Sequence, residues 1–399
     1  MFATGIDTSA PVITDQDGRS IRQDELEKCD HYRRWRDDLR LVQELGIRYL
    51  RYGPPLHRAF VGPGRYDWEF TDDTFGELRR LEIVPIADLC HFGLPDWLGN
   101  SFQNPDFPRY FAEYARAFAE RYPWVRYYTP VNEVYLCAKF SALLGWWNER
   151  LRGEQEFVMA LKHMCLASLS ASEQILAVQP DAVFIQSESS EYFLASTAAP
   201  QATKLADFEN QRRFLALDFL YAHPLRGDVE RYARAHGVSD AEMDNFMNHD
   251  LGRQCVMGND YYFRNEHFVR RDGRIEEAGA LLGWFIVTHE YYQRYKKPLM
   301  LTETSLEDPD EAPRWLRCQW HNVLYMRGQG VPVLGFTWYP LVDHVDMDTA
   351  LREDGGRVNC SGLVDLDRRP HPVAHAYRAL MEDFSEVPVV PNAPFFAVP

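Results

Sequence analysis

Eight short runs rich in β-branched and aromatic residues recur along this chain, separated by longer segments with helical periodicity. Strands that alternate with helices predict βα units joined into a parallel sheet. Eight such units predict an α/β fold, a single (β/α)8 barrel whose functional side chains lie at the carboxyl ends of the strands. The predicted strands are residues 2–7, 47–53, 83–89, 125–131, 182–188, 255–262, 298–303 and 332–339.

Three of the intervening segments have strong helical patterns, at residues 30–46, 107–122 and 156–178. A doubly wound sheet is the main alternative, but a glycine-rich turn usually follows its first strand. The sequence here, GIDTSAP, has no such turn. Because no linker, low-complexity segment or close repeat divides the chain, we predict one domain over residues 1–399. The apolar stripe of the first helix comprises Tyr32, Trp35, Leu39, Val42 and Leu45.

Charge and hydropathy limit the partners of the chain. A formal net charge of −16 disfavours binding to nucleic acid and to anionic membranes. No apolar stretch reaches the roughly 20 residues that span a bilayer, and the start of the sequence lacks a signal-peptide pattern. The seven cysteines are scattered without a C-x-x-C pair, which indicates reduced thiols. We therefore expect a cytoplasmic protein, and homo-oligomerisation stays open.

Motifs for metals and phosphates are missing from the sequence. The segment THEYYQ resembles the zinc motif H-E-x-x-H, but Gln293 stands where the second histidine belongs. The sequence contains no P-loop and no G-x-S-x-G nucleophile elbow. We therefore predict no metal and no cofactor, and we look for chemistry that side chains perform alone.

Two carboxylates end predicted strands on opposite sides of the ring. Glu133 follows the fourth run and Glu303 ends the seventh, so their side chains can face each other across the barrel mouth. Glycoside hydrolysis needs such a pair, with one carboxyl group protonated to give a proton to the leaving oxygen and the other ionised to attack the anomeric carbon. Glu188 and Glu191, after the fifth run, are rival carboxylates for which we expect at most a substrate contact.

Other polar and aromatic residues gather at the same strand ends. Arg51 ends the second run and would favour the charged form of a nearby carboxylate. Tyr262 could donate a hydrogen bond to that carboxylate, and Asn132 could hold a sugar hydroxyl. Aromatic residues make up 14% of the chain. Their faces pack on apolar surfaces, so Trp338 could lie under a sugar ring and Trp146 could line the entrance.

Several segments resemble glycoside hydrolase family 1, whose members are (β/α)8 retaining glycosidases. YTPVNE (128–133) resembles its T-x-N-E motif and LTETS (301–305) its I-T-E-N-G motif. LCHFGLPDWL (89–98) is similar to the H-x-x-L-P segment, with His91 matching, and GNDYY (258–262) resembles G-I-N-Y-Y. YLRYGPPLHR, TWYPLVDHVD and SGLVDLDRRPHPVAHAYRAL also match in order, so the resemblance extends over nearly the whole chain.

The resemblance implies a retaining β-glycosidase of the β-glucosidase or β-galactosidase type. Glu303 would be the nucleophile and Glu133 the acid/base, with their carboxyl groups about 5 to 5.5 Å apart. A terminal β-linked sugar would be hydrolysed by double displacement through a glycosyl-enzyme intermediate. The remaining implied substrate contacts are Asn132, His91, Arg51, Tyr262, Trp338 and Trp146.

The sequence departs from the family pattern where the sugar's distal hydroxyls are read. Near the place of a glutamine in the first unit stand Asp7, Ala10 and Pro11, and the closing Glu and Trp are replaced by Asp346 and Met347. Asp260 replaces the asparagine of G-I-N-Y-Y. We therefore predict Asp7 and Asp346 as hydroxyl ligands and expect an unusual sugar. The alternatives are a transglycosidase and a catalytically silent carbohydrate-binding barrel.

Overall fold

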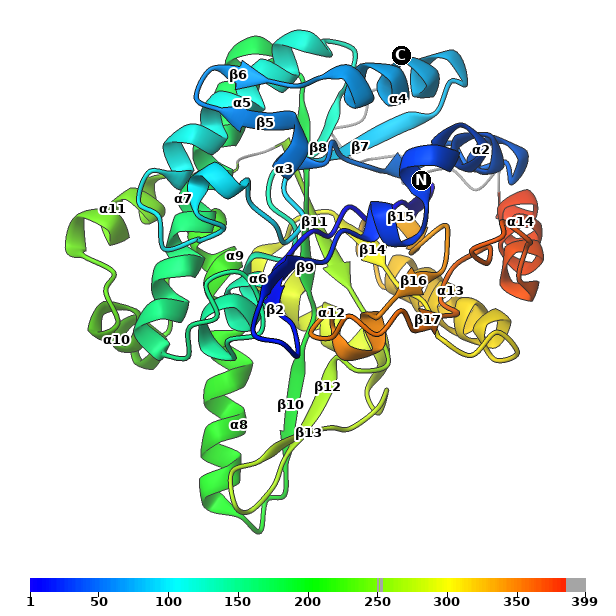
Figure 1. Cartoon of the computed structure of the whole chain (residues 1–399). Helices are drawn as coiled ribbons and strands as arrows, with labels where there is room; N and C mark the ends of the chain where they lie inside the picture. Colours follow the sequence, from blue (N-terminus) through cyan, green and yellow to red (C-terminus); the bar gives the residue numbers. More distant parts are fainter. Residues whose placement is uncertain (250, 252–253, 385–399) are drawn as a thin grey trace.

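The computed structural model describes residues 1–249, 251 and 254–384. Eight parallel strands close into a barrel, and helices surround it (Figure 1). Each predicted run contains or overlaps one of these strands, which confirms the (β/α)8 prediction. In ring order the strands are β1 (Phe2–Gly5), β4 (Tyr49–Arg51), β7 (Val84–Asp88), β8 (Tyr127–Thr129), β9 (Val183–Ser189), β11 (Cys255–Asp260), β14 (Leu299–Glu303) and β15 (Val333–Trp338).

The main apolar core lies between the barrel and its helices. The helix predicted at residues 30–46 is observed at His31–Glu44, with Trp35, Leu39 and Val42 buried. The surrounding helices are α2 (His31–Glu44), α4 (Glu69–Arg80), α5 (Phe107–Arg121), α7 (Glu154–Val178), α8 (Pro200–Arg212), α9 (Leu215–Leu220), α10 (Gly227–Ala235), α11 (Asp240–Asn248), α12 (Gly283–Tyr295), α13 (Ala312–Gly328) and α14 (Pro372–Phe384).

A second, smaller apolar cluster fills the inside of the barrel. Its buried members all come from barrel strands, because alternate residues of a strand point inward. They lie below the polar residues that end the strands, so the barrel is filled rather than hollow. The members are Ala3, Ile86, Val183, Ile185, Val256, Met300 and Leu334.

Short elements follow the carboxyl ends of the strands and border the mouth. The β-hairpin of β2 and β3 is tied to the segment after α6, because Asn148 donates its backbone N–H to Val12 O at 2.7 Å. The short elements are β2 (Val12–Thr14), β3 (Ser20–Arg22), α1 (Glu25–Lys28), α3 (Leu56–Ala59), β5 (Phe60–Gly62), β6 (Arg65–Tyr66), η1 (Asp96–Leu98), α6 (Val134–Ala138), the π-helical turn η2 (Lys139–Leu143), β10 (Tyr192–Ala195), β12 (Glu266–Val269), β13 (Ile275–Glu277), β16 (His344–Val345), η4 (Met347–Thr349) and β17 (Val358–Asn359).

None of the helices in the described part of the chain is both long and apolar enough to cross a membrane. The single domain predicted over residues 1–399 stays a prediction, and its final segment, 385–399, lies outside the described residues.

Candidate active site

Glu303 is held at the end of β14 by a cation and a phenol. Arg51 Nη1 lies 2.5 Å from Glu303 Oε1, and Tyr262 donates its hydroxyl to Oε2 at 2.7 Å. Burial lowers the pKa of Arg51, but the carboxylates of Glu303, Asp260 and Asp88 more than offset it, so the net pKa is raised. The guanidinium group therefore stays charged and stabilises a negative charge on Glu303.

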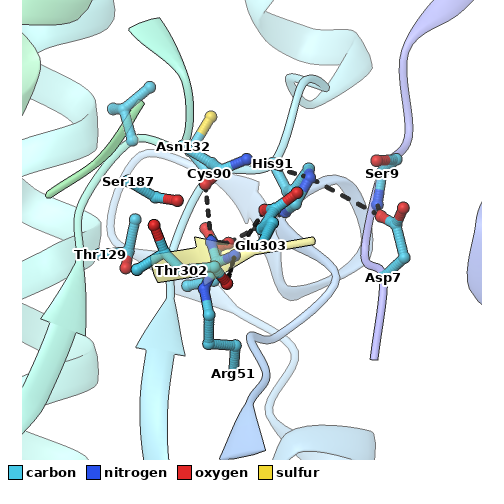
Figure 2. Close-up of polar contacts among 12 residues, drawn as sticks. Asp7, Ser9, Arg51, Cys90, His91, Thr129, Asn132, Ser187, Thr302 and Glu303 are labelled. Atoms are coloured by element: carbon cyan, nitrogen blue, oxygen red, sulfur yellow. Dashed lines mark hydrogen bonds and ion pairs between the residues drawn. The ribbon is translucent and has the colours of Figure 1, made fainter. Parts of the chain in front are cut away.

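Arg51 also orients the amide that precedes the second glutamate. Its Nη2 donates to Asn132 Oδ1 at 2.7 Å, and Asn132 Nδ2 lies 3.2 Å from His91 Nε2. His91 Nδ1 in turn lies 2.9 Å from Asp88 Oδ2, at the end of β7. Figure 2 shows Arg51, Asn132, His91 and Glu303 gathered at one end of the barrel. The structure thus brings together residues at or just after the carboxyl ends of strands β4, β7, β8 and β14.

Glu133 occupies a different electrostatic environment from Glu303. It lies directly before α6 with a left-handed backbone, φ 42°, and its N–H donates to Ser187 O at 3.0 Å. Only 5% of the residue is exposed. Burial, and then the carboxyl groups of Asp260, Glu303 and Glu188, raise the pKa of Glu133 well above its usual value, against the opposing effect of Arg51. This environment therefore favours the protonated form of Glu133.

Asp260 is a third carboxyl group close to both glutamates. It pairs with Glu303 in the register of β11 with β14, and both its oxygens lie within 2.8 Å of Ser187 Oγ. Burial and the neighbouring charge of Glu303 raise the pKa of Asp260 well above its usual value. Ser187 O also accepts from the backbone N–H of Glu133, so Ser187 contacts both Asp260 and Glu133.

The rival carboxylates have partners of their own. Glu188 accepts from the backbone N–H of Tyr135 at 3.0 Å, and burial raises its pKa to about 8. Glu191 lies 2.8 Å from Lys139 Nζ and 3.2 Å from His267 Nε2. Both residues therefore anchor the segments beside the site.

The two predicted hydroxyl ligands, Asp346 and Asp7, differ in how many partners within the protein their carboxylates already bind. Asp346 is fully buried, lies 2.7 Å from Lys28 Nζ, and accepts backbone N–H groups from residues 355–357. Its carboxylate therefore closes a loop. Asp7 lies on the other side of His91 (Figure 2), with its Oδ1 3.7 Å from His91 Nε2. It retains 6% exposure.

The two predicted tryptophans lie apart. Trp338 ends β15, is fully buried, and donates Nε1–H to Ser361 O at 3.0 Å. Trp146 is half-buried in the segment after α6, with Phe140 at 4.5 Å between ring centroids and Arg352 4.2 Å above its ring. The roles of these residues, like those of the other predicted site residues, stay predictions.

Sequence reasoning missed two residues of this region. Tyr339 stacks at 6.3 Å on His91 and lies under Arg51, 5.3 Å from its guanidinium carbon. His344 Nε2 lies 2.9 Å from Asp7 Oδ2. Both residues follow the eighth strand, so their position at a strand end was the available signal. Among residues 1–249, 251 and 254–384, no group of three or more His, Cys, Asp or Glu could hold a metal ion.

Known proteins with similar sequences include bacterial glycosidases. The 6-phospho-beta-glucosidase AscB of Escherichia coli is 23% identical over 87% of this chain and 82% of its own length. The aryl-phospho-beta-D-glucosidase BglH of Bacillus subtilis is 24% identical over 80% of this chain and 78% of its own.

A solved structure shares the fold. The beta-glucosidase from Thermotoga maritima in complex with deoxynojirimycin matches with a TM-score of 0.80 at 18% identity, over 96% of this chain and 97% of that one. The model of glycosyl hydrolase family 1 matches residues 11–263, which is more than half of the chain. The chain therefore belongs to glycosyl hydrolase family 1, and it is a retaining β-glycosidase.

Proposed function

We propose that Glu303 is the nucleophile and Glu133 the acid/base in hydrolysis of a terminal β-linked hexose of the glucose or galactose type. The observation that carries this assignment is the contrast between the two carboxyl groups. Glu303 accepts hydrogen bonds from a guanidinium group and a phenol, whereas burial and three neighbouring carboxyl groups raise the pKa of Glu133 and favour its protonated form. A double displacement requires this opposite protonation.

In the first step, Glu303 forms a bond to the anomeric carbon as the bond to the leaving oxygen breaks. Glu133 gives its proton to that oxygen. In the second step Glu133 takes a proton from water, the water oxygen bonds the anomeric carbon, and the bond to Glu303 breaks. Both glutamates regain their starting protonation.

The other site residues would bind the sugar around this reaction. Asn132 and His91 stand ready to hold hydroxyls near the reacting carbon, and Tyr262 and Arg51 hold the nucleophile. Asp7 is available at the far side, and Asp346 would act through the loop that it closes. Trp338 would support the sugar ring, and Trp146 would border the leaving group.

Azide rescue tests the nucleophile. Glu303→Gly should abolish turnover of an aryl β-glycoside, and added azide should restore it with inverted product, because azide fills the space left by the carboxylate. Glu307→Gly is the matched control, since this glutamate follows the same strand and is half-exposed, and it should keep activity without any azide effect. Loss of activity at Glu303 without azide rescue would count against the assignment.

The comparisons favour hydrolysis over the two alternatives, and each alternative has its own measurement. A transglycosidase would give alkyl glycosides as the main products when an alcohol is added. A silent barrel would bind sugars in calorimetry without turning over any aryl β-glycoside.

We further propose a single domain working in the cytoplasm. Free cysteines support a reducing compartment, since Cys29, Cys90, Cys137, Cys165 and Cys255 are buried as thiols. Light scattering of the purified chain would settle whether it forms a homo-oligomer.

A further inference from the structure

We propose that Asp7, His344 and Glu25 form the closed end of the sugar site and select an uncharged glycone with free distal hydroxyls over a phosphorylated one. This inference rests on the proposed function, because it takes the reacting carbon to lie between Glu303 and Glu133. The proposed preference for an uncharged sugar differs from the phosphorylated substrates that the names of the phospho-β-glucosidase relatives give for those proteins.

A series of polar side chains in successive contact leads from Glu303 to this end of the site. Arg51 links Glu303 to Asn132, which touches His91, and each of these contacts is 3.2 Å or less. Asp7 comes next, 3.7 Å from His91, and His344 follows at 2.9 Å. We take a pyranose with its anomeric carbon at Glu303 to extend toward Asp7.

The carboxylate of Asp7 is held in position by its neighbours and can accept hydrogen bonds from a sugar. Ser9 N–H donates to Oδ1 at 2.7 Å, and His344 Nε2 faces Oδ2 at 2.9 Å. Burial raises the pKa of Asp7, but His91 and His344 more than offset it, so the net pKa lies below its usual range. A carboxylate has about four acceptor positions, so each oxygen can still accept one hydroxyl proton. Two neighbouring hydroxyls fit this arrangement.

Glu25 is buried behind this pair. Its backbone N–H donates to Ser9 O at 3.0 Å, and its Oε2 accepts from Val345 N at 3.2 Å. Its Oε1 is buried and has no hydrogen-bond partner among the described residues. Burial raises the pKa of Glu25 to about 8, so the group is a neutral acid at pH 7. A neutral acid can donate to a hydroxyl oxygen and adds no counter-charge for an anion.

The histidines and cations near this end already face carboxylates: His91 lies 2.9 Å from Asp88, and His344 lies 2.9 Å from Asp7. Lys28 Nζ lies 2.7 Å from Asp346 and 3.0 Å from Asp354. Arg357, whose backbone also binds Asp346, pairs with Asp348 at 2.9 Å and Glu353 at 3.1 Å. A sugar phosphate would therefore meet the anion of Asp7 in a buried site, where like charges repel strongly.

Two substrates with one aglycone test the selection. The probes are 4-nitrophenyl β-D-glucoside or galactoside and the matching 6-phosphate. We expect kcat/KM for the uncharged glycoside to exceed that for the phosphorylated one by at least about 100-fold, since an unpaired buried charge is strongly disfavoured. A higher value for the phosphorylated glycoside would overturn the proposal.

Binding separates this inference from the proposed activity. Calorimetry of the intact enzyme with glucose, galactose and their 6-phosphates needs no turnover. Tighter binding of a neutral sugar supports the pocket even if no glycoside is hydrolysed, in which case the assigned activity alone fails. Tighter binding of a phosphate, or no binding of any of these sugars, would refute the pocket.

The isosteric variant Asp7→Asn tests the residue itself. It should lower kcat/KM for the uncharged glycoside about 10- to 100-fold, the range for lost hydrogen bonds to a charged group. It should also reduce the ratio of kcat/KM for the uncharged substrate to kcat/KM for the phosphorylated one by at least about tenfold, because the repelling charge is gone. Asp73→Asn, at an exposed position, is the matched control and should change neither value. An equal loss on both substrates would show a merely structural role and contradict the proposal.

Discussion

Arg51 Nη1 lies 2.5 Å from Glu303 Oε1, although the two residues are 252 positions apart in the chain. The same guanidinium group bonds Asn132, which directly precedes Glu133. One buried cation therefore fixes the charge of one glutamate and the position of the residue beside the other.

Replacing this cation should disable the site without unfolding the barrel. We expect Arg51→Gln to lower kcat/KM for an aryl β-glycoside at least about 100-fold, the magnitude for loss of a preorganised charge-stabilising group. Far-UV circular dichroism verifies the fold, and Arg36→Gln, at an exposed position, serves as the control. Activity close to that of the unaltered enzyme would refute the role of Arg51.

The phenol of Tyr262 should matter in the same way but less. Tyr262→Phe removes the hydroxyl that donates to Glu303 Oε2 at 2.7 Å and leaves the ring in place. We expect kcat to fall about 10- to 100-fold, as for other hydrogen bonds to a charged group. Tyr325→Phe, on an exposed side chain, should leave kcat unchanged. An unchanged kcat in the Tyr262 variant would show that the hydrogen bond from Tyr262 to Glu303 does not contribute to catalysis.

The third carboxyl group should set the alkaline limit of activity. Asp260 is among the groups that raise the pKa of Glu133, so Asp260→Asn should lower that pKa. Glu133 must be protonated in the free enzyme, and the alkaline limb of kcat/KM against pH should therefore move to lower pH. A full pH profile of both proteins measures the shift. A uniform loss of activity without movement of this limb would show that Asp260 acts only in packing.

Gly5 marks a place where the backbone of β1 meets an aromatic ring. A Cβ atom at Gly5 would lie 2.1 Å from Tyr339 Cε2, closer than any van der Waals contact. We expect Gly5→Ala to lower the free energy of unfolding by about 1–3 kcal/mol in urea titrations, as overpacking does. Gly76→Ala is the control, because Gly76 lies in α4 with nothing within 4 Å of the added atom. That variant should be as stable as the parent or up to about 1 kcal/mol more stable. Equal stability of the Gly5 variant would contradict the clash.

The barrel and the positions of the two glutamates follow from the sequence because strand patterning is local. Each run carries its own alternation of β-rich and helical residues, and closure of eight units places Glu133 and Glu303 at the same rim. The resemblance of YTPVNE and LTETS to family motifs then distinguishes these two glutamates from Glu188, which binds backbone N–H groups instead.

The closed end of the pocket was harder to predict because it depends on loop conformation. Closure makes β1 and β15 neighbours, so residues after the first and last strands had to meet. Which side chains meet depends on left-handed backbone at positions such as Asp346, φ 62°. No periodic pattern encodes that turn. Asp7 was therefore predictable as a polar residue near the site, whereas its pairing with His344 was not.

Covalent trapping tests the central claim most directly. The enzyme is incubated with an activated aryl 2-deoxy-2-fluoro-β-glycoside, which slows breakdown of the intermediate, and is then examined by intact mass spectrometry and peptide mapping. We predict one glycosyl group per chain, attached to the peptide that contains Glu303. Attachment to Glu188, Glu191 or Asp260, or turnover with inverted product and no attached sugar, would contradict the account.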